Sequence, residues 1–253
     1  MDILLLKLTA TPAIIGTASI IGRRWGPGVA GWFVGIPFTS APVVFFTALT
    51  YGPQFGAQVA LGILLASISQ VCFALVFARV ARHASWQLAV AAATVVFAVF
   101  TVALRPVVLP LAAIFPAAFL CIGLALTFMP RSVAETVATA ITPSRWDLPL
   151  RMTIATAIVV ALTELAGMLG PHVTGLLSPY PLIGTILAVF AYQKRGGEGA
   201  AQVMRGFVAG LFAFSTFFAV VAALLVPMGL GWSFAIALAA TLLVQGVTFW
   251  GLL

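Results

Sequence analysis

Residues 26–62 read GPGVAGWFVGIPFTSAPVVFFTALTYGPQFGAQVALG, and residues 170–206 read GPHVTGLLSPYPLIGTILAVFAYQKRGGEGAAQVMRG. The second stretch follows the first at an offset of 144 positions without a gap, and 11 of the 37 aligned positions are identical. A self-match at a fixed offset indicates two copies of one structural unit. The identical pairs are Gly26/Gly170, Pro27/Pro171, Val29/Val173, Gly31/Gly175, Pro37/Pro181, Phe46/Phe190, Gly52/Gly196, Ala57/Ala201, Gln58/Gln202, Val59/Val203 and Gly62/Gly206.

The composition is that of a membrane protein. Of the 253 residues, 63% are hydrophobic and 7% are charged, whereas about a quarter of the residues are charged in a soluble domain. Several apolar runs exceed the ~20 residues that a helix needs to cross a bilayer. These runs are continuous rather than alternating, which excludes a β-barrel. We therefore predict an all-α polytopic membrane protein with the lipid bilayer as its main partner.

The apolar runs predict nine transmembrane helices. The region 86–129 must hold two of them, because as one helix it would extend about 66 Å, roughly twice the thickness of the hydrocarbon core. Arg105 and Pro106 mark the turn between the two helices. The nine predicted spans cover residues 3–21, 28–50, 55–78, 86–104, 107–129, 150–169, 171–192, 200–226 and 229–250.

The basic residues fall on one side of this topology. The opposite side has only Arg105 and, just inside the first span, Lys7. The positive-inside rule then places the N-terminus outside and the C-terminus in the cytoplasm of what we expect to be a bacterial inner membrane. The net charge of +7 thus reflects topology and does not indicate nucleic-acid binding. The residues on the basic side are Arg23, Arg24, Arg79, Arg82, Arg131, Arg145, Arg151, Lys194 and Arg195.

The span count gives the repeat a direction. Five spans separate the starts of the two copies, so the second copy crosses the membrane in the opposite sense. The prediction is two inverted four-helix repeats, spans one to four in residues 1–104 and spans six to nine in residues 150–253 (145–250 counted from the approach to span six). Residues 105–149 would form a connecting span and a cytoplasmic amphipathic loop.

The candidate binding site lies where both copies carry proline and glycine in the middle of a span. Broken helices at bilayer depth are tolerated where the freed backbone groups are buried in protein or line a cavity. Paired interrupted spans in inverted halves point to a transporter binding site. The alternative is a pair of kinks filled by neighbouring helices, with the hydroxyls bonded back to their own helix. The candidate residues are Gly35, Pro37, Thr39, Ser40, Pro42, Ser178, Tyr180, Pro181, Gly184 and Thr185.

Glu164 is the only acidic residue well inside a predicted span, and Ile20 is its counterpart in the first copy. An acid inside a membrane is a functional hypothesis by default. Three interpretations stay open: a carboxylate that couples transport to protons, a structural ion pair with Lys7, and an exposed position at the outer interface.

Five further polar residues could support the site. Lys7 and Arg151 occupy equivalent first-turn positions, where they either reach the lipid headgroups or contact an anionic substrate, and Arg205 has the same two readings. Gln58 and Gln202 are equivalent positions near the starts of spans three and eight. They either cap and pack helices or bond the broken span beside them.

The leading functional hypothesis is a small secondary transporter that moves a neutral or anionic small molecule by alternating access. The alternatives are a channel or pore, and a non-transporting membrane subunit or lipid-processing factor. No HExxH, P-loop or GxSxG motif is present, so we predict no enzyme activity, no cofactor and no metal site. Gly-x-x-x-Gly patterns at 31–35 and 206–210 indicate either internal helix packing or a homodimer.

Overall fold

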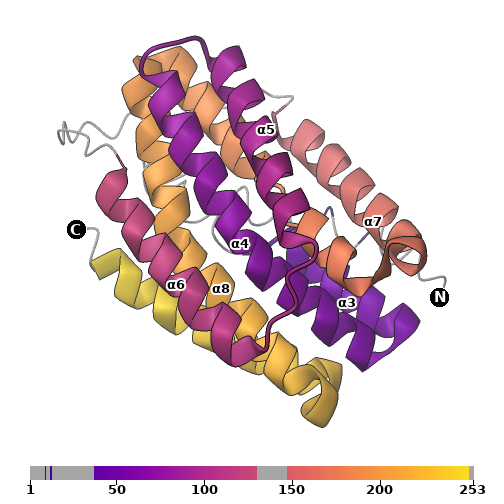
Figure 1. The fold of residues 1–253 in the computed structure, drawn as a ribbon. Helices are drawn as coiled ribbons and strands as arrows, with labels where there is room; N and C mark the ends of the chain where they lie inside the picture. The colour runs from indigo at the N-terminus through magenta and orange to yellow at the C-terminus, as the bar shows by residue number, and fades with distance from the viewer. Residues whose placement is uncertain (1–8, 10–11, 13–36, 130–146, 251–253) are drawn as a thin grey trace.

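A computed structural model describes residues 9, 12, 37–129 and 147–250. Within these ranges the regular secondary structure is α-helical (Figure 1). The predicted first span apart from residues 9 and 12, the first part of the second span and the loop at 130–146 lie outside the described residues. The helices are α3 (Ser40–Tyr51), α4 (Pro53–Ala81), α5 (Trp86–Leu104), α6 (Leu111–Phe128), α7 (Asp147–Leu177) and α8 (Leu182–Trp250).

The described helices have the length and composition of a membrane protein. Helices α4, α5 and α6 and the helical region Met152–Thr248 are each long and apolar enough to cross a bilayer. Helices α5 and α6 are separate, with Arg105 and Pro106 in the turn between them, as predicted. The prediction of a helical membrane protein is confirmed in this form. The count of nine spans stays a prediction.

Glycines with positive φ divide the helical chain. Gly52 (φ 93°) separates α3 from α4, and Gly170 (φ 75°) divides α7. Gly196 (φ 64°) and Gly229 (φ 72°) divide α8 into the segments 182–195, 197–228 and 230–250. Residues that carry a side chain rarely adopt a positive φ, so glycine permits a sharp turn between consecutive helices.

Helix α4 is the centre of the bundle. It contacts α3, α5, α6, α7 and α8. In the most apolar 18-residue stretch of α4, 72% is buried, compared with 22% in the corresponding stretches of α5 and α6. Small residues allow this close approach. A Cβ added at Gly62 would lie 2.7 Å from the carbonyl oxygen of His172 and 3.0 Å from Cα of Gly175. Backbone-to-backbone contact of this kind is how small residues associate helices in membranes.

Helix α4 and the 197–228 segment of α8 run antiparallel. Gly197, at the start of the segment, lies against Ala81 and Arg82 at the end of α4. At the other end, a Cβ added at Gly56 would be 2.9 Å from Cδ2 of Leu225. An ion pair of 2.7 Å between Arg82 and Glu198 joins the first of these ends.

Two arginines hold the C-terminal end of α6 at the same end of the bundle. Arg205 Nη1 donates to the carbonyl oxygen of Leu126 at 2.8 Å, and Arg79 Nη2 donates to that of Phe128 at 3.3 Å. The last carbonyls of a helix have no partner within the helix and carry partial negative charge. The two guanidinium groups therefore fix α6 against α4 and α8.

Candidate functional site

The second of the two proline clusters interrupts the helical chain completely. Helix α7 ends at Leu177 and α8 begins at Leu182, with residues 178–181 between them outside any helix. Pro179 and Pro181 cannot donate a backbone hydrogen bond, and each would clash with the carbonyl four residues earlier in a continuous helix. The predicted broken helix at 171–192 is thus two helices joined by a non-helical tetrapeptide.

The first proline cluster forms a matching non-helical stretch. Pro37, Phe38 and Thr39 lie outside any helix, and α3 begins at Ser40. The two stretches meet, because Ser40 Oγ donates to the carbonyl oxygen of Ser178 at 3.4 Å. Both Ser40 and Ser178 are buried. The contact joins residues 138 positions apart in the chain.

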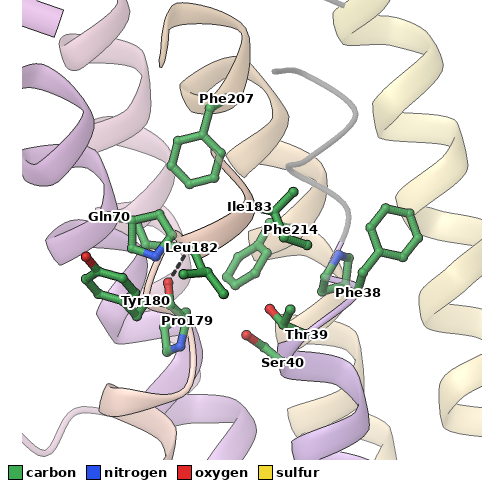
Figure 2. A pocket seen from close by; sticks show the side chains of 12 residues that line it. Phe38, Thr39, Ser40, Gln70, Pro179, Tyr180, Leu182, Ile183, Phe207 and Phe214 are labelled. Atoms are coloured by element: carbon green, nitrogen blue, oxygen red, sulfur yellow. Dashed lines mark hydrogen bonds between the residues drawn. The ribbon is translucent and has the colours of Figure 1, made fainter. Parts of the chain in front are cut away.

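A small cavity of about 20 Å³ lies between the two interruptions. Its volume is close to that of a single water molecule. Figure 2 shows residues from both stretches around it, together with side chains from α4 and α8. The lining residues are Pro37, Phe38, Thr39, Ser40, Gln70, Pro179, Tyr180, Pro181, Leu182, Ile183, Phe207 and Phe214.

Gln70 brings a polar group from the middle of α4 into this lining. Its Nε2 donates to the carbonyl oxygen of Pro179 at 2.8 Å. Its Oε1 is buried and has no hydrogen-bond partner among the described residues. The side chain is 3% exposed. A buried polar atom without a partner costs about 1–3 kcal/mol, so this oxygen is well placed to accept a hydrogen bond from an occupant of the cavity.

Tyr180 anchors the second interruption to α5. Its hydroxyl and Thr94 Oγ1 share a hydrogen bond of 2.8 Å. Its ring meets those of Phe73 and Phe97 edge-on, at centroid distances of 5.9 and 5.4 Å. Aromatic pairs prefer this geometry. The Tyr180 hydroxyl is therefore engaged by Thr94, and its ring is packed against α4 and α5.

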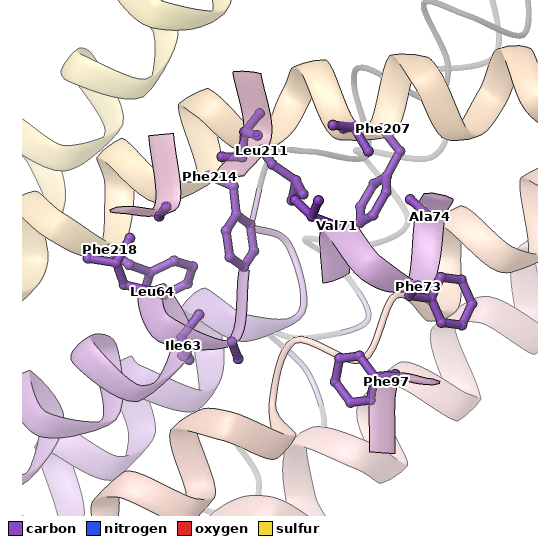
Figure 3. Packing of buried hydrophobic residues seen from close by; sticks show 14 of the residues in the cluster. Ile63, Leu64, Val71, Phe73, Ala74, Phe97, Phe207, Leu211, Phe214 and Phe218 are labelled. Atoms are coloured by element: carbon purple, nitrogen blue, oxygen red, sulfur yellow. The ribbon is translucent and has the colours of Figure 1, made fainter. Parts of the chain in front are cut away.

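The opposite side of the cavity is formed by the aromatic core. Phe207 and Phe214 of α8 border the cavity and belong to the buried cluster between α4 and α8. Figure 3 shows them with Leu211 and Phe218 of the same segment, packed against Ile63 and other side chains of α4. The cavity thus has a polar wall at Gln70 and the interruptions, and an apolar wall of phenylalanines.

Helix starts dominate the electrostatics of the cavity. Both α3 and α8 begin at its border, at Ser40 and Leu182. The first N–H groups of a helix lack intrahelical acceptors, and the N-terminal end carries partial positive charge. In the part of the chain that the structure describes, the lining contains neither an acidic nor a basic side chain. The local field therefore favours an electronegative group.

The structure brings together half of the predicted binding residues. Gly35 lies outside the described residues. Ser178 contributes its carbonyl oxygen to the contact with Ser40 without lining the cavity. Gly184 and Thr185 belong to the first turn of α8, where Thr185 Oγ1 donates back to the carbonyl of Pro181 at 2.7 Å. The predicted residues that line the cavity are Pro37, Thr39, Ser40, Tyr180 and Pro181.

The expectation that Pro42 interrupts the helix is wrong. Pro42 is the third residue of α3 and is buried in the core outside the cavity lining. In the first turn of a helix a missing N–H costs nothing, because that group has no intrahelical acceptor. Its ring would clash only with a carbonyl of the preceding helical turn, and Phe38 is not helical.

Glu164 is not part of the cavity lining. Its side chain is exposed on α7. The three interpretations of Glu164 given above all stay open. Proton coupling through Glu164 stays a prediction, and it now depends on the position of this acid along α7 rather than on burial.

The supporting residues have varied environments. Lys7 and the side chain of Arg151 lie outside the part of the chain that the structure describes. Gln58 is exposed and Gln202 is half-buried, and neither lines the cavity. The half-buried Arg205 binds the C-terminal carbonyls of α6, which is a packing role.

Gln70 was missed by the sequence reasoning, which considered only glutamines that recur in both copies. At the offset of 144, the counterpart of Gln70 is Phe214, so the repeat gave no signal. A different signal was available, because Gln70 is the only amide side chain between residues 59 and 86. A lone amide in a membrane-length apolar run is expected to hydrogen-bond another segment.

Comparison of the chain with protein-family models, with curated proteins and with solved structures found no match.

Proposed function

We propose that this chain is a small secondary transporter of a bacterial inner membrane, which carries a neutral or anionic small molecule by alternating access. Its binding site would be the cavity between the interruptions at residues 37–39 and 178–181. The single observation that carries the proposal is the meeting of these two interruptions at a partly polar cavity inside an apolar bundle. Non-helical backbone at membrane depth is expected where it lines a binding site.

The residues that line the cavity support a two-fold relation between the halves of the chain. Four pairs of lining residues are separated by the repeat offset of 144. Inverted repeats place a substrate site on their pseudo-two-fold axis. The pairs are Pro37/Pro181, Phe38/Leu182, Thr39/Ile183 and Gln70/Phe214.

The helix boundaries support the same relation. Helix α4 begins at Pro53 and its partner segment at Gly197, while α5 begins at Trp86 and its partner at Leu230. Both pairs are again 144 positions apart. The antiparallel arrangement of α4 and the 197–228 segment supports the proposal that the two copies cross the membrane in opposite directions. In the proposal, the two inverted four-helix repeats and the connecting α6 make up nine spans.

The substrate class follows from the field in the cavity. Two helix N-termini face it, and its described lining has no carboxylate that could hold a cation. A neutral or anionic group is therefore favoured. Movement of one half of the chain against the other would open the cavity to each side in turn.

The proposal can be tested without knowing the substrate. In a variant in which Cys72 and Cys121 are replaced by alanine, we introduce Thr39→Cys at the cavity and apply a membrane-impermeant maleimide to right-side-out or inside-out vesicles. An alternating-access protein exposes the cavity to each side in turn, so Thr39→Cys is expected to react from both sides. The matched control is Thr50→Cys, on the exposed last turn of α3, the helix that follows Thr39, which is expected to react from one side only.

Two results would contradict the proposal. If Thr39→Cys reacts from neither side while Thr50→Cys reacts normally, the interruptions are filled by packing, as in a non-transporting subunit. If Thr39→Cys reacts rapidly from both sides and reconstituted vesicles lose an imposed membrane potential, the protein contains a continuous pore.

A further inference from the structure

The amide of Gln70 can both donate and accept hydrogen bonds, and only its donor has a partner among the described residues. Nε2 donates to the carbonyl oxygen of Pro179, and Oε1 has no partner among the described residues. The orientation of the amide is determined by this bond, because the reversed amide would place its oxygen against the Pro179 carbonyl. Gln70 lines the cavity, and its buried acceptor is unpaired among the described residues.

The starts of α3 and α8 favour the opposite kind of group, a hydrogen-bond acceptor or an anion. The first turns of α3 and α8 border the cavity and carry positive partial charge. The N–H groups of Ala41 and Leu182 already donate to the carbonyl oxygens of Pro37 and Tyr180, so the attraction rests on the helix ends as a whole.

Thr39 and Ser40 add hydroxyls, which lie on the side of α3 that faces Pro179 (Figure 2). An occupant that satisfies both walls must offer an electronegative group to the helix starts and an N–H or O–H to Gln70.

We propose that the cavity selects a small organic acid that also carries a hydroxyl or amino group, and that Gln70 Oε1 accepts a hydrogen bond from this second group. The inference rests on the proposed function and specifies its substrate class. A simple cation is disfavoured by the two helix starts. An acid without a donor leaves the Gln70 oxygen desolvated and unpaired, and sites with such an orphaned group reject the analogue strongly.

The present cavity, at about 20 Å³, is too small for such an acid, so binding requires it to widen. Opening requires the interruptions to separate. The hydrogen bond that joins them, from Ser40 to Ser178, is long at 3.4 Å, whereas the bonds that hold residues 179 and 180 to α4 and α5 are both 2.8 Å. The stretch 37–40 is therefore expected to move while residues 179–180 stay with α4 and α5.

The test compares lactate with propionate, two three-carbon acids that differ by one hydroxyl. The purified full-length protein in detergent is titrated with each acid, and the half-saturating concentration is taken from the rise in melting temperature. We expect lactate to bind at least about tenfold more tightly than propionate, since a lost hydrogen bond to a buried group is worth about this factor. Alanine, which offers an amino group, is expected to behave like lactate.

Two variants assign the preference to Gln70. In Gln70→Leu the difference between lactate and propionate is expected to disappear. In Gln58→Leu, a change of the same chemistry at an exposed position of the same helix, the difference is expected to persist. If the acids bind equally to the unmodified protein, if neither lactate nor alanine binds, or if Gln70→Leu keeps the preference, the inference is wrong.

A second measurement does not depend on the folding of Gln70→Leu. Lactate is expected to slow the maleimide reaction of Thr39→Cys, and propionate at the same concentration is not. If Thr39→Cys reacts from both sides without protection by lactate or alanine, the transporter proposal stands and the substrate class falls. If Thr39→Cys is unreactive from both sides, both proposals fall.

Discussion

Individual side chains of α4 and α5 tie the second interruption to its surroundings, and their counterparts at the repeat offset cannot do the same for the first. Gln70 and Thr94 bind residues 179 and 180 through hydrogen bonds of 2.8 Å. The counterparts of these two residues at the repeat offset are Phe214 and Leu238, which cannot form such bonds. The two halves of the chain therefore differ in how firmly their interruptions are held, and the difference originates in two substitutions between the copies.

The bond between Tyr180 and Thr94 provides a prediction at this scale. Tyr180→Phe and Thr94→Val each remove one partner, and each is expected to lower the free energy of unfolding by about 0.5–1.5 kcal/mol. The double variant is expected to lose less than the sum, because a single bond is shared. Thermal or denaturant unfolding in detergent measures all three. Strictly additive losses would mean that the bond contributes nothing to stability.

At the scale of helices, glycines act in two distinct ways. Gly52, Gly170, Gly196 and Gly229 have positive φ and join successive helices by sharp turns. Gly62 lies within α4, where the absence of a side chain lets the backbone of α7 approach. The first group is needed for conformation and Gly62 for space, so substitutions fail for different physical reasons.

Replacement of Gly62 by alanine tests the second role. Because the added methyl group would lie 2.7 Å from the His172 carbonyl oxygen, Gly62→Ala is expected to cost about 1–3 kcal/mol of stability. Gly123→Ala is the matched control, since no atom lies within 4 Å of a Cβ at this position of α6. There the gain in helix propensity should leave stability unchanged or raise it by up to about 1 kcal/mol. Equal effects of the two substitutions would show that α4 and α7 do not pack this closely.

For the whole molecule, the basic residues define one end of the bundle. Arg79, Arg82 and Arg205 lie where α4 and α6 end, and the 2.7 Å pair of Arg82 with Glu198 joins the start of the 197–228 segment to the same end. The turn between α5 and α6, which carries Arg105, follows the opposite end of α5. The proposed orientation places the first end in the cytoplasm, because basic residues concentrate on that side of a membrane.

Single cysteines in the alanine-substituted variant described above test this orientation. His83→Cys lies in the exposed turn after α4, and Val108→Cys lies in the α5–α6 connection, where Val108 is 83% exposed. His83→Cys is expected to react with an impermeant maleimide only from the cytoplasmic side, and Val108→Cys only from outside. Reaction of both from the same side would contradict the proposed topology, and exchanged sides would invert it.

Much of the fold was predictable because its main determinant is local. Continuous apolar runs of membrane length identified α4, α5 and α6, and the turn at Arg105 and Pro106 followed from a length limit. Proline chemistry likewise predicted the interruption at 178–181. Pro42 shows where local reasoning failed, because the cost of a proline depends on whether the preceding turn is helical, and that depends on where α3 begins.

The sequence by itself determined that this chain is a helical membrane protein and that a proline cluster interrupts its helices at residues 178–181. These properties follow from hydrophobicity, backbone geometry and chain length. Only the tertiary structure decided that the two interruptions meet, that Gln70 reaches the cavity between them, and that Glu164 is exposed. Each of these depends on which faces of the helices come together, and helices that are apolar on all sides give little indication of their orientation in the sequence.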